Sequence, residues 1–360
     1  MTHVLEPFRF ASGVEARNRV ALAALTNQQS HEDGSLSDDE LGFLEQRAQG
    51  GFAIVCTCAA HVALGGRGFE GQLGVYDDAL LPGLERLASA LSARGALPIV
   101  QLYHGGSRSP MRLTGQQSIS ASDVAFEADS DPPRAATPSE LAQLVDDFVA
   151  AAERCHRAGL AGVEIHGAHG YLFTQFLSTT TNRRTDEWGG SLRNRARLLL
   201  DVLEGIKRRV PASFLVGVRL SPEGFAKVTG LDLAESIELA GWLAASGADF
   251  LHLSLWDAFA DSKQRPGQHP LPLFREACPE LPLVAAGKIW TLPDAERVLE
   301  HGADLVALGR AAICNPDWPR AATAPDFTPR RPPLSPEELA ERGLSPKFVE
   351  YMRRWRDFVA

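Results

Sequence analysis

Short runs of apolar and β-branched residues recur along the chain and alternate with longer stretches that have a different spacing. Several of the runs are apolar almost throughout, as in parallel strands that are covered on both faces. The eight runs span residues 19–25, 52–56, 97–103, 162–166, 214–220, 250–255, 283–286 and 304–308. This pattern predicts eight parallel β-strands.

Helix-like stretches, with apolar residues three and four positions apart, separate the runs. The clearest span residues 81–94, 138–158, 192–210, 232–246 and 293–300. Glycines that can end a helix in the left-handed conformation stand at Gly95, Gly159, Gly247 and Gly302. The alternation of strand and helix predicts an α/β fold, a single (β/α)8 TIM barrel, with a doubly wound open sheet as the alternative.

Two segments exceed what a minimal barrel requires. Residues 105–137 form a long polar excursion after the third strand, which we expect to be a lid or a pocket wall. Residues 326–360 follow the predicted barrel of residues 1–325 as a Pro-rich and then helical tail, which packs on the barrel or extends from it. The basic cluster Arg353, Arg354 and Arg356 is typical of a solvated helix face, with a binding role as the alternative.

The composition is that of one sizeable globular unit of 360 residues, 44% hydrophobic and 22% charged. The net charge of −9 argues against nucleic acid as a partner, because phosphate backbones need a basic surface. We find no signal peptide and no apolar stretch of about 20 residues, and we therefore expect a cytoplasmic protein with no membrane partner. A small-molecule ligand is favoured, and the sequence leaves a homo-oligomer open.

Five cysteines are scattered along the chain, at Cys56, Cys58, Cys155, Cys278 and Cys314. They form neither a disulfide framework nor a paired Cys-x-x-Cys metal motif. Cys56 and Cys58 lie two apart in an apolar run, so they share one face of the predicted strand. We expect them to pack in the core.

Enzymes built on a (β/α)8 barrel carry their chemistry at the C-terminal ends of the strands. The seventh and eighth predicted strands end in Gly287-Lys288 and Gly309-Arg310. Loops at these two places commonly hold a phosphate, because glycine lets backbone N–H groups approach the anion and arginine adds a forked donor. A phosphorylated ligand is favoured, and a surface ion pair beside a strand-ending glycine is the alternative.

Three more polar residues at strand ends would converge on the barrel axis: Thr26, Gln101 and Arg219. Together they offer a hydroxyl, an amide and a permanent cation, which suit a flat ring that carries carbonyl oxygens and ring nitrogens. Arg219 would stabilise the negative charge that a flavin gains on reduction, and Gln101 can both donate and accept. Each residue taken singly is equally compatible with an ordinary strand-end polar group.

The segment EIHGAHGY, residues 164–171, is the densest functional signal. Its two histidines, His166 and His169, lack a helix-borne HExxH pattern and an obvious third ligand, so we expect no metal site. As donors they could hold a carbonyl oxygen and stabilise negative charge there. A tyrosine side chain carries a hydroxyl proton, and Tyr171 could deliver it. The alternative for Tyr171 is a buried side chain bonded to backbone.

These residues stand in segments that resemble the old yellow enzymes over roughly residues 5–325. The segments are NRVALAALTNQQS, GGFAIVCTCAA, PIVQLYHGGSRS, VEIHGAHGYLFTQFLSTTTNRRTDEWGGSLRNRARLL, VGVRLSPE and ADLVALGRAAICNPDWP. The resemblance implies a flavin enzyme in which FMN lies across the barrel mouth and NADH or NADPH reduces it. The flavin then passes hydride to the β-carbon of an activated alkene, a small-molecule substrate.

The resemblance also implies a role for each position. Three residues would contact the flavin ring from the first two strands, namely Thr26 at O4 and Leu25 and Ala59 through their backbones. Gln101 and Arg219 would hold the pyrimidine edge, and Gly287, Gly309 and Arg310 would take the phosphate. His166 and His169 would bind the substrate carbonyl, and Tyr171 would protonate the α-carbon.

Some positions depart from the family pattern. Thr26 stands where some members have a cysteine, and Gln28 stands where one branch has a substrate-capping tyrosine. Trp256 is a candidate pocket wall, with simple packing as the alternative. Three rival functions stay open: a related flavin enzyme with another oxidisable substrate, a binding protein, and a non-flavin aldolase or isomerase. The last of these would need a catalytic lysine, and Lys288 is the only lysine near such a position.

Overall fold

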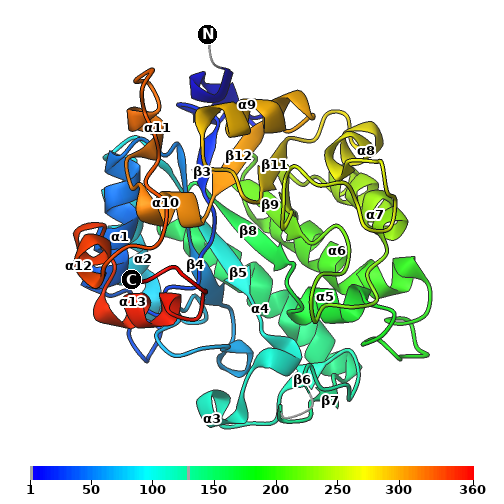
Figure 1. Ribbon diagram of the computed structural model, residues 1–360. Coiled ribbons are helices and arrows are strands. Elements are labelled where there is room, and N and C mark those ends of the chain that lie inside the picture. Colours follow the sequence, from blue (N-terminus) through cyan, green and yellow to red (C-terminus); the bar gives the residue numbers. More distant parts are fainter. Residues whose placement is uncertain (1–2, 128–129) are drawn as a thin grey trace.

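Eight parallel strands close into a barrel in the computed structural model, which describes residues 3–127 and 130–360 (Figure 1). Each barrel strand pairs with the next barrel strand along the chain, and the last barrel strand pairs with the first. The barrel strands are β3 Val20–Leu22, β4 Ile54–His61, β5 Leu97–Tyr103, β8 Gly162–Gly167, β9 Leu215–Leu220, β10 Phe250–Ser254, β11 Leu283–Ala286 and β12 Leu305–Leu308. The predicted (β/α)8 barrel is confirmed, and closure excludes the open sheet.

The first two barrel strands differ from their predicted lengths. β3 is shorter because the chain leaves the ladder after Ala23, whose N–H still donates to the Leu308 carbonyl at 3.0 Å. β4 is longer because it continues through a register shift between Cys56 and Ala59. The shift brings Ala59 opposite Gln101, at the mouth of the barrel.

Helices cover the outside of the barrel, as the periodicity predicts (Figure 1). The main ones are α1 Asp38–Gln49, α2 Leu81–Ser92, α4 Pro138–Arg157, α6 Leu192–Arg209, α7 Leu233–Ala245, α8 Pro270–Ala277 and α9 Leu292–Glu300. The four glycines expected after helices have positive φ angles, from 71° at Gly95 to 104° at Gly302. Asp232 caps α7 by accepting a hydrogen bond from the Glu235 N–H.

The inside of the barrel is filled in two layers of different polarity. Toward the N-terminal ends of the strands, Ile99, Phe250 and Val284 belong to an inner apolar cluster that Phe10 also enters. A Cβ atom at Gly217 would lie 2.1 Å from the Phe250 ring, so glycine makes room for that ring. Two residues further along their strands, Gln101 and His252 begin a polar layer beneath the mouth.

The excursion after β5 packs against the mouth. It holds the short helix α3 Met111–Thr114 and the parallel pair β6 Ile119–Ser120 and β7 Arg134–Ala135; residues 128 and 129 of the predicted 105–137 segment lie outside the described residues. Buried Gln175 of α5 Leu172–Leu177 accepts from the Ser107 N–H and the Ser120 hydroxyl and donates to the Gly105 carbonyl. The excursion therefore has a fixed anchor beside the strand-four histidines.

The C-terminal tail returns across the barrel to its mouth (Figure 1). Its helices are α12 Pro336–Glu341 and α13 Pro346–Met352, and it follows α10 Arg310–Cys314 and α11 Trp318–Ala321. Phe348 of α13 packs edge-on against Phe43 of α1 at 5.3 Å between ring centroids. Buried Arg47 donates to the carbonyls of Arg342 and Ala312, which ties the tail to α1 and α10.

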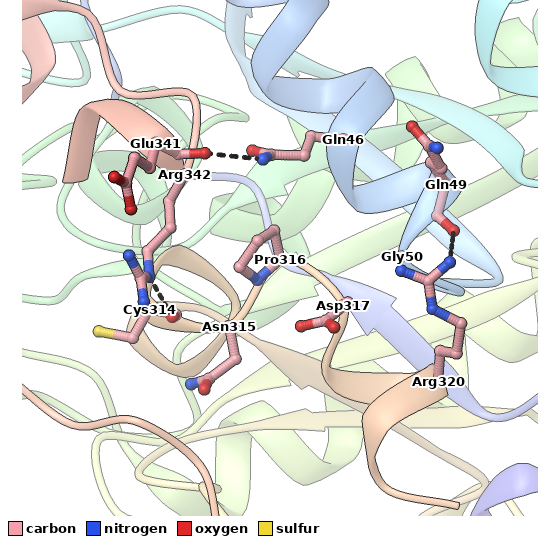
Figure 2. Close-up of a pocket in the computed structure, with 10 residues that line it drawn as sticks. All are labelled: Gln46, Gln49, Gly50, Cys314, Asn315, Pro316, Asp317, Arg320, Glu341 and Arg342. Atoms are coloured by element: carbon pink, nitrogen blue, oxygen red, sulfur yellow. Dashed lines mark hydrogen bonds between the residues drawn. The ribbon is translucent and has the colours of Figure 1, made fainter. Parts of the chain in front are cut away.

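A cleft of about 430 Å³ lies where this tail meets α1 and the segment from α10 to α11 (Figure 2). Three polar side chains span it and donate to backbone carbonyls: Arg342 to Cys314, Gln46 to Glu341 and Arg320 to Gln49. None of the predicted site residues lines the cleft. These contacts make it a seam between the tail and the barrel.

Candidate active site

The two strand-four histidines lie together at the barrel mouth. The rings of His166 and His169 are 5.1 Å apart and nearly perpendicular. The Ala168 N–H donates to His166 Nδ1 at 3.3 Å, and His169 Nε2 lies 2.7 Å from the Ser254 hydroxyl. His169 has a φ of +62°, an uncommon backbone conformation for a non-glycine residue and one that collects at functional sites.

Both imidazoles are neutral at physiological pH. Burial lowers the pKa of His166 well below its usual range, and electrostatic interactions with the neighbouring His169 ring and with Arg219 lower it further. Burial also lowers the pKa of His169 well below its usual range, with Arg219 as the next contributor. A neutral imidazole offers one N–H donor, and at His166 that donor is Nε2 because Nδ1 already accepts a hydrogen bond.

Tyr171 lies beside this pair, at 5.0 Å from the His166 ring. The buried Tyr103 packs edge-on against it at 4.6 Å. The guanidinium of Arg108, from the excursion, lies 4.4 Å from the Tyr171 ring centroid and donates to the His169 carbonyl at 2.7 Å. The tyrosine therefore sits between the histidines and a cation.

Gln101 and Arg219 lie in the polar layer below the histidines, and neither is isolated. Gln101 Nε2 donates to the buried Glu164 carboxylate at 2.6 Å. Arg219 donates to the Ser254 hydroxyl at 3.0 Å and to the Ala24 carbonyl at 3.4 Å. Its Nε is buried and has no partner among the residues that the structure describes.

The predicted phosphate residues stand at the ends of β11 and β12. Gly287 has a φ of +150°, and a Cβ there would lie 2.3 Å from the Leu255 carbonyl oxygen, so the position requires glycine. Gly309 precedes α10 and has only the Leu25 side chain within 3.5 Å of a built Cβ. Arg310 is exposed at the first position of α10. The backbone here is open to a ligand, with a cation beside it.

The first-strand residues meet the C-terminal tail at the mouth. Burial raises the pKa of Tyr351, on α13, while a hydrogen bond with Thr26 opposes the rise and Tyr171 adds to it. The Ala59 carbonyl is already occupied, because Gln72 Nε2 donates to it at 2.7 Å. Any backbone contact that Ala59 makes to a ligand must therefore share this oxygen or use the N–H.

An aromatic stack forms one rim of the mouth. Trp256, which follows β10 and is 52% exposed, stacks on Phe225 at 4.3 Å, with Trp355 of the tail 6.5 Å away on a nearly parallel plane. Lys288, the lysine that a Schiff-base mechanism would need, pairs with Asp257 at 3.0 Å and is half exposed. A solvated, ion-paired ammonium is a poor nucleophile, which disfavours the aldolase alternative.

Residues 3–127 and 130–360 contain neither a metal cluster nor a membrane-spanning helix. Within these ranges, histidine, cysteine and carboxylate side chains form no group of three that could hold a metal ion. No helix in the described part of the chain is long and apolar enough to cross a membrane.

Residues 3–324 match the NADH:flavin oxidoreductase / NADH oxidase family. The chain belongs to this family. It is 40% identical over 324 residues to a probable NADH-dependent flavin oxidoreductase of Bacillus subtilis, covering 88% of this chain and 86% of that protein. It is 34% identical to the NADH:fumarate oxidoreductase of Klebsiella pneumoniae over 88% of this chain, and it spans only about a third (35%) of that protein.

Among solved structures, the old yellow enzyme homologue of Zymomonas mobilis has a TM-score of 0.82 and 28% identity, over 96% of this chain and 98% of that one. The expected resemblance to old yellow enzymes is thereby confirmed. So are the flavin oxidoreductase class, FMN as cofactor and NADH or NADPH as reductant. The family enzymes include reductases of activated alkenes, as expected for the function.

The residues at the mouth fit an FMN. The orphaned Arg219 Nε is a buried donor that needs an acceptor, and a flavin carbonyl or ring nitrogen supplies one. The open backbone at Gly309 and the exposed guanidinium of Arg310 suit a phosphate. The amide of Gln101 suits the imide edge of the ring.

Several site residues escape prediction from the sequence. Glu164 lies inside the motif that drew attention, but an isolated glutamate gives no sign that its carboxylate is buried. His252 could have been noticed as a polar residue on an apolar strand, two residues before Ser254. Arg108 and Tyr351 give no local signal, because only the fold of the excursion and the tail brings them to Tyr171 and Thr26.

Neutral buried histidines predict a loss of stability in mild acid. Burial lowers the pKa of His61 to about 4 and that of His104 to about 3. Below pH 6.5 the two histidines are protonated in the unfolded chain but stay neutral in the folded protein. The free energy of unfolding therefore falls as the pH falls toward 4. Each histidine contributes about 1.4 kcal/mol per pH unit. Urea unfolding at pH 7.5, 6.0 and 5.0 measures the slope.

The variant His61→Gln isolates this effect. Its slope between pH 6 and 5 should be shallower than that of the wild type by about 1.4 kcal/mol per pH unit, whatever its stability at pH 7.5. Identical slopes would show that His61 is already protonated in the folded protein at pH 5.

Proposed function

We propose that the protein reduces the carbon–carbon double bond of a small α,β-unsaturated carbonyl compound, and that His166 and His169 bind the carbonyl oxygen. The observation that carries the proposal is the pair of neutral imidazoles 5.1 Å apart beside Tyr171, with His166 buried and His169 half-buried. Donors held at the place where an oxygen gains negative charge lower the barrier to its formation. FMN, when bound, supplies the hydride that the β-carbon accepts.

The hydrogen bonds on the far sides of the two rings support this role. His166 Nδ1 accepts from backbone, which leaves its Nε2–H for the substrate. Ser254 accepts from Arg219, and its own hydrogen can go to His169 Nε2, which leaves Nδ1 of His169 as the protonated nitrogen. Each ring then presents one N–H donor, and both can meet a single carbonyl oxygen.

Tyr171 completes the reaction in this proposal by giving its hydroxyl proton to the α-carbon. The tyrosine becomes an anion at that moment, and the Arg108 guanidinium 4.4 Å from its ring stabilises the charge. Arg108 also donates to the His169 carbonyl, so one arginine supports both catalytic positions.

The residues that converge beneath His166 and His169 are the ones to which we assign the cofactor. We propose that Gln101 and Arg219 hold the pyrimidine edge of FMN and that Thr26 contacts O4. Leu25 and Ala59 contact the ring through their backbones. Gly287, Gly309 and Arg310 hold the phosphate. Buried Arg219, with its unpartnered Nε among the described residues, is the strongest support for the placement of the ring.

We propose that the chain consists of a barrel, residues 1–325, and a tail, residues 326–360. The tail forms part of the substrate pocket in this proposal. Tyr351 reaches Thr26, and Trp355 lies parallel to Trp256 at the rim. Flat, apolar enones should suit such a wall better than charged ones. We propose a cytoplasmic location and no nucleic-acid partner, and the net charge of −9 supports the second of these.

Phenols test the carbonyl-binding role, because a phenolate oxygen imitates the oxygen that gains charge during reduction. His166→Ala and His169→Ala should each weaken binding of a para-substituted phenol roughly ten- to hundredfold, as expected for loss of a hydrogen bond to a charged group. The perturbation of the flavin absorption band on titration measures the affinity. The exposed His156, at the end of α4, gives the control variant His156→Ala, which should bind as the wild type does.

Undiminished phenol binding in both His166→Ala and His169→Ala would remove the carbonyl-binding role. Stoichiometric zinc in the purified protein, with loss of activity on its removal, would also contradict it.

A further inference from the structure

Glu164 is an ion buried beneath the mouth, with both carboxylate oxygens in use. Its Oε1 accepts from Gln101 Nε2 at 2.6 Å, and its Oε2 accepts from His252 Nδ1 at 2.7 Å. Both contacts are buried, and the residue is 3% exposed. The three side chains come from β8, β5 and β10, so the barrel itself holds them together.

A buried carboxylate at this level of the barrel does not stabilise the fold relative to an apolar side chain. Two positions before Gln101 on β5 and before His252 on β10, Ile99 and Phe250 form part of the inner apolar cluster. Extending that apolar layer would avoid the cost of burying an ion, which amounts to several kcal/mol even after relaxation. The polar layer lies directly beneath the position predicted for the flavin ring. A role of this layer toward the flavin therefore explains its polarity better than stability does.

Contacts within this polar layer determine the protonation states of Glu164 and His252. Burial would raise the pKa of Glu164, but the electrostatic interaction with His252 and its hydrogen bond, then the charge of Arg219 and the hydrogen bond from Gln101, lower it, so the carboxylate is ionised. Burial lowers the pKa of His252, so the imidazole is neutral and donates through Nδ1. The layer therefore holds one anion and one cation, Glu164 and Arg219.

The first consequence concerns the amide of Gln101. A free glutamine can turn either its oxygen or its nitrogen toward a ligand. Glu164 accepts only, so it binds the nitrogen and leaves Oε1 as the available atom. The imide N–H of a flavin is a donor and needs an acceptor, so an amide fixed in this orientation matches it.

The second consequence concerns charge. A flavin gains negative charge on reduction, and Arg219 favours that charge. Glu164 is close enough to Arg219 to perturb the pKa of its guanidinium, and it opposes the effect of the cation. The carboxylate therefore makes the flavin harder to reduce than Arg219 alone would.

We propose that Glu164 and His252 are positioning residues that fix the Gln101 amide oxygen toward the flavin imide and offset the charge of Arg219, and so set the reduction potential of the bound FMN. The inference rests on the proposed placement of FMN at Gln101 and Arg219. It assigns no contact between Glu164 and the substrate.

The variant Glu164→Gln tests the charge while it keeps the shape. Its amide oxygen can still accept from Gln101, but the negative charge is gone. The equilibrium constant for FMN reduction should rise about tenfold, which corresponds to a midpoint potential about 30 mV more positive for a two-electron couple. Anaerobic titration of the holoenzyme against a reference dye, followed by absorbance, measures the potential without any turnover.

The control removes a carboxylate at the other end of the barrel. Asp249, just before β10 and three residues before His252, accepts hydrogen bonds from Lys207 and from the Val216 N–H at the N-terminal end of the strand. Asp249→Asn should lower stability and leave the potential unchanged. A wild-type potential in Glu164→Gln, or an equal shift in both variants, would overturn the inference.

His252 supplies a second test that does not depend on the folding of Glu164→Gln. His252→Leu removes the contacts that lower the pKa of Glu164, so the buried carboxyl should take up a proton, lose its charge and shift the potential in the same positive direction. His252→Asn can donate from its amide and should restore a value near that of the wild type. Equal potentials in His252→Leu and the wild type would remove His252 from the role. Apoprotein that takes up no FMN at all would instead contradict the proposed function.

Discussion

Replacing Tyr171 by phenylalanine should slow the oxidation of reduced enzyme by an enone roughly 10²- to 10⁴-fold, the usual contribution of a positioned general acid. The reduction of the enzyme by NADH or NADPH should stay nearly unchanged, because it requires no proton from the tyrosine. Stopped-flow absorbance resolves the two half-reactions, since the flavin band bleaches in the first and recovers in the second. The smaller value applies if water reaches the α-carbon in place of the hydroxyl.

Tyr76 offers a matched control for this experiment. It stacks on His61, away from the strand-four cluster, and its hydroxyl donates to the Asp33 carbonyl at 2.8 Å. Tyr76→Phe should leave both half-reactions unchanged. Equal slowing of both half-reactions in Tyr171→Phe would indicate a packing role for the ring, and no slowing of the second would assign the proton to another donor.

The second large effect concerns the affinity for FMN. Arg310→Ala should weaken FMN binding roughly ten- to hundredfold, because a charge-assisted hydrogen bond to phosphate contributes about 1.5–3 kcal/mol. Titration of apoprotein with FMN, followed by quenching of the flavin fluorescence, measures the dissociation constant. The residue is exposed, so the variant should fold normally.

Arg320 is the control for the loss of an exposed arginine near the same helices. It lies on α11 and donates to the Gln49 carbonyl at 3.5 Å, outside the strand ends. Arg320→Ala should bind FMN as the wild type does. Unchanged affinity in Arg310→Ala would mean that backbone N–H groups after β11 and β12 hold the phosphate alone.

The barrel is predictable from the sequence because its signals are local and repeated. Apolar runs covered on both faces mark the strands, and Gly95, Gly159, Gly247 and Gly302 have the positive φ angles expected at helix ends. The lengths of β3 and β4 were less predictable. A register shift after Cys56 and the departure of the chain after Ala23 depend on contacts with neighbouring strands, which local spacing does not contain.

The convergence of the candidate site residues is predictable only where they lie on a barrel strand or directly after one. Gln101, His166 and Arg219 lie on strands and His169 follows one, and all these strand ends meet at one mouth. Arg108 does not, because the excursion could fold in many ways before Gln175 anchors it. Tyr351 was missed for a similar reason, in that contacts of Phe348 and Arg47 decide where the tail lies.

The basic cluster Arg353, Arg354 and Arg356 is exposed, as expected, but it lies in the turns that follow α13, which ends at Met352, and not on a helix face. Arg353 and Arg356 pair with Glu350 and Asp357 on the surface, at 3.3 and 3.4 Å. The part of the tail that reaches the mouth is aromatic, and charge patterning gives no indication of it. Cys56 and Cys58 are buried, as expected for core packing.

Reduction of an activated alkene at this mouth can be followed in a single turnover. Anaerobically reduced holoenzyme is mixed with 2-cyclohexenone, and the flavin absorbance and the product are recorded together. We expect full recovery of the oxidised flavin band and one cyclohexanone formed per flavin. Flavin that stays reduced in the presence of this and other enones, yet is reoxidised by a different acceptor, would contradict the proposed function.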